Sequence, residues 1–177
     1  MNLLRFIARW WAAFALVAAI ALLGGAHAFE VFGGMAPCPL CLKQRDVYWV
    51  AIAISLPATL WALFSHSKGT PRLAAFLLFA VFAAGAAVAT FHAGGELHWW
   101  KLPATCGGSL GPVNADDLIT ALSGRIRMPA CDVAAWKMWG ISMAGWNAII
   151  SGGLALFSLI SSMRRKSDRG WQDNVLR

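Results

Sequence analysis

The sequence predicts an all-α membrane protein, a bundle of four transmembrane helices with one long outer loop. Hydrophobic residues make up 59% of the chain and charged residues 13%, and the mean hydropathy of +0.60 lies outside the usual soluble range. A helix needs about 20 apolar residues to cross a hydrocarbon core of roughly 30 Å. Four stretches of about this length occur, at residues 10–28, 47–64, 73–91 and 139–160. None shows the alternation of apolar and polar residues that a transmembrane barrel strand has. We therefore expect helices, whose internal hydrogen bonds satisfy the backbone N–H and C=O groups in lipid.

The first span has an alternative interpretation as a cleavable signal peptide. Arg5 and Arg9 precede its apolar run, and Ala26-His27-Ala28 resembles an A-x-A cleavage site. The apolar run is long for a signal peptide, so we expect a retained span. A mature chain that begins at Phe29, detected by intact mass, would contradict four spans.

The other spans complete a single integral membrane domain over residues 1–177. A loop at residues 29–46 leads to the second span, a tight turn at 65–72 leads to the third, and a loop at 93–138 leads to the fourth. Small residues are frequent in spans three and four, which predicts that both helices sit inside a tight bundle. A basic tail at 161–177 follows the last span.

The charge distribution predicts the orientation of the bundle. The face that holds both termini and the turn 65–72 carries nine basic residues against two acidic ones, whereas the other face carries six of each. By the positive-inside rule the first face is cytoplasmic and all four cysteines are outside. Topology and anionic lipid account for the net charge of +7, so we expect no nucleic-acid partner.

The outer loop 93–138 has room for a short amphipathic helix. Asn114 and Asp117 resemble a helix start, and apolar residues recur on one helical face at Leu118, Ile119, Leu122 and Ile126. The sequence leaves open whether such a helix lies on the membrane surface or forms a small exposed core of its own.

Cys38 and Cys41 form a CxxC pair just before the second span. A helix start and nearby cations both lower a thiol pKa, and Lys43 and Arg45 follow within about one turn, so Cys41 is the better-placed thiolate. A dithiol at this spacing can switch to a disulfide with little rearrangement.

Cys106 and Cys131 lie in the long outer loop, where a disulfide between them would be open to attack by an outside thiolate. Two alternatives stay open. Both pairs could be inert bridges of an oxidising compartment, or all four cysteines could bind zinc. The second pair lacks the short spacing of a zinc half-site, so we expect no metal.

A membrane dithiol needs an electron acceptor, and the sequence has no haem or dinucleotide motif. A lipid-soluble quinone is the natural acceptor. Arg45, at the membrane edge, could donate hydrogen bonds to a quinone carbonyl, or its side chain could extend to the headgroups. His92, at the outer end of span three, could face the quinone or supply a proton, or be structural.

The motifs together resemble the DsbB family of bacterial inner-membrane disulfide bond formation proteins. They comprise PCPLCLKQR at 37–45, the pair Cys106 and Cys131, CDVAAW at 131–136 and GISMAGWN at 140–147. The resemblance covers essentially the full length. It implies a four-helix bundle that reoxidises the periplasmic thiol oxidase DsbA and passes the electrons to ubiquinone or menaquinone.

The resemblance also implies a role for each site residue. Cys106 would form the mixed disulfide with DsbA, and Cys131 would react onward with Cys38. Cys41 would contact the quinone through a charge-transfer or covalent adduct. Arg45 matches the quinone-site arginine of the family, whereas the residues that flank His92 are less distinctive.

The loop after Cys106 departs from the family pattern, because GGSLGP at 107–112 replaces a Trp- and Pro-rich stretch. The partner could therefore be DsbA or a dedicated oxidase with a different groove. DsbA is a strong oxidant at roughly −120 mV, so thiols alone reoxidise it with difficulty and quinone reduction must drive the cycle.

Three other functions remain as alternatives. A redox enzyme similar to vitamin K epoxide reductase shares the helical bundle and the CxxC. A membrane protein with structural disulfides or a zinc site would show no turnover. A transporter has little support, since no span carries a charged pair at mid-depth.

Overall fold

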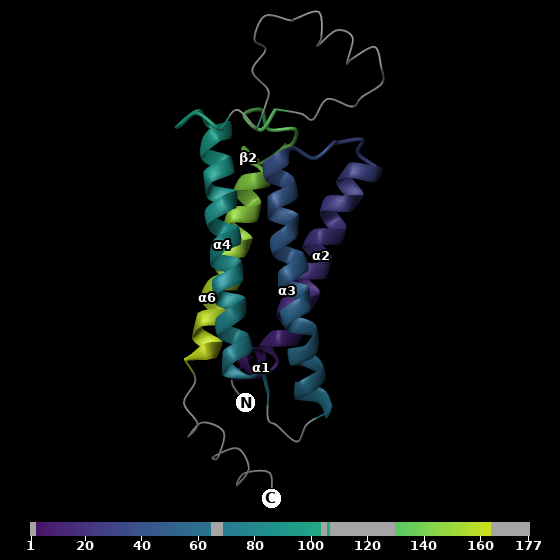
Figure 1. The fold of residues 1–177 in the computed structure, drawn as a ribbon, viewed down its shortest axis with the longest axis vertical. Coiled ribbons are helices and arrows are strands. Elements are labelled where there is room, and N and C mark those ends of the chain that lie inside the picture. The colour runs from purple at the N-terminus through teal and green to yellow at the C-terminus, as the bar shows by residue number, and fades with distance from the viewer. Residues whose placement is uncertain (1–2, 65–68, 104–105, 107–129, 164–177) are drawn as a thin grey trace, which may run out of the picture.

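The computed structural model describes residues 3–64, 69–103, 106 and 130–163. Four long helices run side by side (Figure 1): α2 (Trp11–Val31), α3 (Pro39–Phe64), α4 (Arg72–Glu96) and α6 (Met143–Ser162). Each is long and apolar enough to cross a membrane, which confirms the predicted four-helix architecture. The surface helix expected near residues 114–126 and most of the tail lie outside the described residues.

The helices do not coincide with the apolar spans. α3 begins at Pro39, well before the predicted span at Val47, and α4 continues past Phe91 to Glu96. Hydropathy detects only the apolar part of a helix, and the added turns carry polar residues. Proline suits the first helical position because it has no N–H to leave unpaired. As a result Cys41 lies inside the first turn of α3, not in the loop before it.

A short helix precedes the first span and was not predicted. α1 (Leu3–Arg9) lies across the lower end of the bundle in Figure 1, and the chain bends at Trp10 before α2. Thr70 closes this bend, because its N–H donates to Arg9 O at 2.9 Å and its Oγ1 accepts from the Ala12 N–H at 3.0 Å. Gly69 has φ +120° and approaches Arg9 too closely for any side chain.

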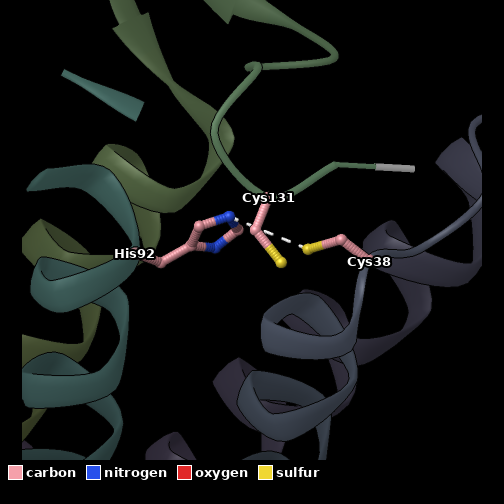
Figure 2. A group of neighbouring side chains, drawn as sticks. All are labelled: Cys38, His92 and Cys131. Atoms are coloured by element: carbon pink, nitrogen blue, oxygen red, sulfur yellow. Dashed lines mark hydrogen bonds between the residues drawn. The ribbon is translucent and has the colours of Figure 1, made fainter. Parts of the chain in front are cut away.

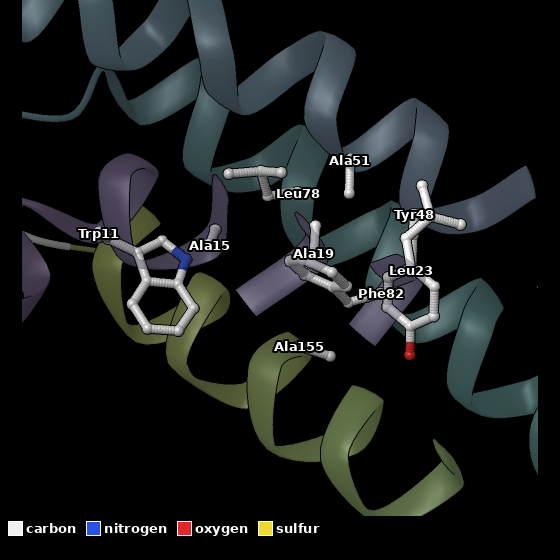
Figure 3. Close-up of a cluster of buried hydrophobic side chains, with 9 residues drawn as sticks. All are labelled: Trp11, Ala15, Ala19, Leu23, Tyr48, Ala51, Leu78, Phe82 and Ala155. Carbon is white, nitrogen blue, oxygen red and sulfur yellow. The ribbon is translucent and has the colours of Figure 1, made fainter. Parts of the chain in front are cut away.

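The helix interfaces are made from small residues and a few large ones. α4 packs chiefly against α6, and α2 and α4 each pack against α3. A Cβ on Gly85 of α4 would lie 2.8 Å from Val47 Cγ1 of α3, so this glycine allows close approach. Figure 3 shows the buried core, where Phe82 and Leu78 meet alanines of the other helices.

A two-stranded hairpin, which the sequence did not predict, joins the outer loop to α6. β1 (Lys137–Met138) pairs antiparallel with β2 (Ile141–Ser142). The turn residues Trp139 and Gly140 both have positive φ, at 52° and 80°, as the tightest hairpin turns require. Ser142 then caps α6 by accepting a hydrogen bond from the Gly145 N–H at 3.1 Å. The fourth helix therefore starts at Met143, later than the predicted span.

Candidate active site

The four cysteines meet at one end of the bundle, opposite α1. Cys38, Cys106 and Cys131 are buried in one cluster, against which Cys41 and Leu102 pack. All four are thiols in this structure. Figure 2 shows Cys131 above the space between Cys38 and His92, with their side chains directed toward one another. Residues from α3, α4 and the outer loop thus build a single thiol centre.

Cys38 and Cys41 occupy the start of α3. The Cys38 carbonyl accepts the first helical hydrogen bond, from the Leu42 N–H at 3.1 Å, and the Cys38 sulfur accepts from the Cys41 N–H at 3.2 Å. The two sulfur atoms lie 2.7 Å apart, so a small movement brings them to disulfide distance. The adjacent Cys41 sulfur and burial raise the pKa of Cys38 above its ordinary value, so the pair holds at most one thiolate.

The end of α4 folds back to position Cys106. A Cβ on Gly94 would lie 2.1 Å from the Trp100 ring, and one on Gly95 would lie 2.5 Å from Leu102. Two glycines therefore allow the chain to return along the helix, where Trp100 stacks on Phe91 and donates to its carbonyl at 3.0 Å.

The backbone links the two loop cysteines, because the Cys131 N–H donates to Cys106 O at 3.3 Å. Burial, followed by the neighbouring Cys131, raises the pKa of Cys106 to about 12. Cys106 is therefore held as a thiol in the reduced state.

His92 lies between the thiols and a buried polar network. Its Nε2 is 3.7 Å from Cys38 Sγ, and its Nδ1 is 2.9 Å from the Gln44 side-chain nitrogen. Asn147 donates to the Gln44 side-chain oxygen and accepts from the Tyr48 hydroxyl. The network joins α3, α4 and α6, and it fixes the direction of the imidazole ring.

Arg45 is held between α3 and α2. Its guanidinium donates to the Glu30 carboxylate and, at 3.2 Å, to Ala26 O, and its side chain is only 13% exposed. An arginine that reached for headgroups would be exposed, so the structure favours an inward-facing role. Five N–H donors are available on a guanidinium, and these contacts leave others for a ligand.

A cavity of about 360 Å³ opens beside the CxxC pair. Its walls are mainly apolar and come from α2, α3, α4, α6 and the segments before α3 and α6. The polar or reactive residues that line it are Cys38, Cys41, Arg45 and His92, together with Gln44, Tyr48, Glu96 and Asn147. This volume and this mixture of groups are typical of a small-molecule site. The sequence-predicted residues of α3 and α4 therefore share one cavity, and Cys106 and Cys131 lie beside it.

The structure adds residues that the sequence did not single out. Glu96 lies one turn after His92, with its Oε1 3.8 Å from His92 Nε2. The i,i+4 spacing of these two residues could have indicated the pair, but the predicted third span ended before Glu96. Glu30, Gln44 and Asn147 carry no comparable signal, because their contacts depend on how separate helices pack.

A multi-pass membrane bundle that gathers two pairs of thiols beside an apolar cavity has the features of a membrane thiol oxidoreductase. The family model described as "Disulfide bond formation protein DsbB" matches residues 8–161, and the chain belongs to this family of disulfide-generating enzymes.

Two relatives carry the name "Disulfide bond formation protein B". The protein from Marinobacter nauticus is 31% identical over 172 residues, which cover 92% of this chain and 96% of the relative. The protein from Methylococcus capsulatus is 32% identical over 154 residues, which cover 79% of this chain and 85% of the relative. No solved structure matches this chain.

Proposed function

We propose that this single-domain protein reoxidises a periplasmic DsbA-type thiol oxidase and passes the electrons to a membrane quinone, ubiquinone or menaquinone. The observation that carries the proposal is the meeting of all four cysteines beside the apolar cavity lined by Arg45 and His92. In this proposal the bundle lies in the bacterial inner membrane, with the termini cytoplasmic and the cysteines periplasmic.

The first exchange takes place at the loop pair. In the oxidised enzyme, a thiolate of the partner attacks the Cys106–Cys131 disulfide. A sulfur with a raised pKa leaves poorly, and burial raises the pKa of Cys106, so attack that expels Cys106 is disfavoured. The partner therefore bonds to Cys106 and Cys131 leaves as the thiolate. This direction supports the role expected for Cys106.

The second exchange carries the electrons toward the cavity. The Cys131 sulfur lies within 4.8 Å of Cys38 Sγ, and it attacks the Cys38–Cys41 disulfide. The raised pKa of Cys38 makes it the poorer leaving group, so Cys41 is expelled as the thiolate. The second thiol of the partner then releases Cys106, and Cys106 displaces Cys38 from Cys131. The loop disulfide is restored, and two electrons rest on Cys38 and Cys41.

The cavity supports quinone as the acceptor. The Cys38–Cys41 dithiol would give two electrons and two protons to a quinone held in the cavity, which would restore the Cys38–Cys41 disulfide and yield the quinol. The apolar walls suit its ring and tail, and Arg45 lines the same cavity as Cys41, so its remaining N–H donors can hold a carbonyl oxygen there. His92, held by Gln44, keeps its Nε2 at the Cys38 sulfur.

Trapping tests the partner and the direction together. In a Cys131→Ala variant, the free Cys106 thiol attacks the disulfide of the oxidised partner, and no loop thiol remains to displace the partner from Cys106. A mixed disulfide through Cys106 with a periplasmic thioredoxin-like protein should therefore accumulate. The matched Cys106→Ala variant should accumulate none. Adducts should be read by non-reducing electrophoresis and mass spectrometry of the linked peptides. Absence of the adduct, or an adduct through Cys38 instead, would overturn the proposed relay.

A further inference from the structure

Three metal-binding side chains from different segments meet in the thiol centre. The donor atoms of Cys38, His92 and Cys131 all lie within 4.8 Å of one another, and all three residues are buried. Figure 2 shows that they come from the start of α3, from α4 and from the outer loop. Spacing along the sequence could not indicate such a set, and it differs from a site made of four cysteines.

A fourth donor lies next to His92. The Glu96 side chain is only 8% exposed, and its Oε1 is 3.8 Å from His92 Nε2. Its Oε2 is buried and has no hydrogen-bond partner among the described residues. Burying a carboxylate oxygen without a partner is costly, and a cation bound beside it would offset that cost.

The donor types and separations fit zinc. Zinc in proteins is tetrahedral, with bonds of about 2.0–2.3 Å to Cys, His and carboxylate ligands, which separates neighbouring donors by about 3.3–3.8 Å. The observed separations of His92 Nε2 are 3.7 Å from Cys38 Sγ and 3.8 Å from Glu96 Oε1. The Cys131 sulfur lies within 4.8 Å of the Cys38 and His92 donor atoms, and movement of Cys131 and Glu96 would complete the set around an ion.

The surroundings of His92 also suit a ligand. A metal-bound histidine donates its other ring N–H to an acceptor. The Gln44 side-chain amide lies 2.9 Å from Nδ1, and it offers its oxygen once the Gln44 and Asn147 amides turn over together, because Asn147 now donates to the Gln44 oxygen and must then accept from the Gln44 nitrogen. The Tyr48 hydroxyl, which now donates to Asn147, would then accept from it.

We propose that the reduced enzyme binds one zinc ion through Cys38, Cys131, His92 and Glu96. Binding forms two metal–thiolate bonds and releases the two thiol protons. Because Cys38 and Cys131 are then both engaged, the ion halts electron transfer between the loop pair and the CxxC pair. This inhibitory consequence rests on the proposed function, whereas the binding itself does not.

Metal titration tests the site directly. The full-length protein in detergent, reduced with a phosphine that does not bind zinc, should take up one Zn²⁺ per chain in competition with a chromophoric chelator. The fully oxidised protein should take up none. X-ray absorption should show two sulfur and two nitrogen or oxygen neighbours. One-to-one binding by the oxidised protein, or four sulfur neighbours in the reduced one, would overturn the proposal.

Matched variants identify the ligands. Glu96→Gln and His92→Ala should each weaken zinc binding by at least about tenfold, because even outer-shell losses at metal sites cost about 10–100-fold. Cys41→Ala and Cys106→Ala should keep the wild-type affinity, since neither sulfur belongs to the set. The reverse pattern would indicate a site made of the four cysteines and would sink this assignment.

A separate assay tests the inhibition. Saturating Zn²⁺ should stop thiol-dependent quinone reduction in the wild-type enzyme, and a chelator should restore it. Turnover at the full rate with zinc bound would contradict the block. An enzyme that binds zinc but never reduces quinone would instead contradict the proposed function and leave the binding site standing.

Discussion

At the scale of single residues, Glu30 sets the direction of the Arg45 side chain. Arg45 can reach a ligand in the cavity only if its guanidinium is held in that direction. The carboxylate of Glu30 and the carbonyl of Ala26, both on α2, fix the guanidinium beside the cavity. Glu30 is the more exposed partner, at 36%, so the ion pair should contribute modestly to stability and chiefly to direction.

A Glu30→Gln variant tests this positioning role. We expect the KM for quinone to rise about three- to tenfold, equivalent to about 1 kcal/mol, while the rate of exchange between the partner and Cys106 stays unchanged. Steady-state quinone reduction and stopped-flow thiol exchange measure the two quantities. Asp46→Asn, which removes an exposed carboxylate at the same end of the bundle, is the matched control and should change neither. An unchanged KM in Glu30→Gln would remove the role.

The pKa of Cys106 predicts a pH dependence. Burial and Cys131 raise this pKa to about 12 in the reduced protein, so the reactive thiolate is scarce at neutral pH. Alkylation of Cys106, followed by peptide mass spectrometry, should still accelerate above about pH 9, where an ordinary thiol has levelled off. Unfolded chains lose this proton at lower pH, so the reduced fold should lose stability as pH rises from about 9 toward 12. A plateau below about pH 9 in the folded protein would contradict the environment described.

At the scale of elements, the end of α4 and the segment that folds back along it position Cys106. Gly94 and Gly95 let residues 97–103 fold back, where Trp100 approaches Gly94 and stacks on Phe91, and Leu102 approaches Gly95.

A Gly94→Ala variant should therefore displace Trp100 and the returning segment that positions Cys106. Its Cβ meets the Trp100 ring at 2.1 Å, which should cost about 1–3 kcal/mol of stability and reduce exchange at Cys106. Thermal unfolding and mixed-disulfide formation report the two effects. Gly153→Ala on α6 is the control, because nothing lies within 4 Å of its added Cβ. Equal behaviour of the two variants would show that the close approach has no role.

Whether an element could be predicted depends on its length and on how apolar its residues are. The four spans were predictable because lipid demands long apolar helices. The polar first turns of α3, which carry Cys41, Gln44 and Arg45, lie outside any hydropathy window, so the sequence placed Cys41 before the helix instead of inside it. The hairpin β1–β2 was missed because two-residue strands have no periodicity to detect.

At the scale of the whole molecule, the two ends of the bundle differ in what they contain. The thiol centre and the cavity lie at one end, and α1 with the start of α4 lies at the other. The sequence predicted that the cysteines share a side, and it named Arg45 and His92 from spacing and family resemblance. It could not predict that Glu30, Gln44 and Asn147 complete the site, because those contacts arise only when separate helices pack. It missed Glu96 because the predicted third span ended at Phe91, before the helix does.

The orientation of these ends is open to direct measurement. In a cysteine-free background, a Phe32→Cys variant at the cysteine end should react with a membrane-impermeant maleimide in intact spheroplasts. A Leu73→Cys variant at the other end should react only after the membrane is permeabilised. Both parent side chains are exposed, at 89% and 69%, so burial does not distinguish them. The opposite labelling pattern would reverse the proposed topology.

The most direct test of the central claim is turnover of a reduced DsbA-type oxidase by the purified protein, with quinone content controlled. We expect one quinol to form for each partner disulfide produced. Once quinone is removed, oxidation of the partner should stop after at most one or two exchanges per enzyme. A Cys41→Ala variant should form no quinol at all. Sustained oxidation of the partner in the verified absence of quinone and of any other oxidant would contradict the account.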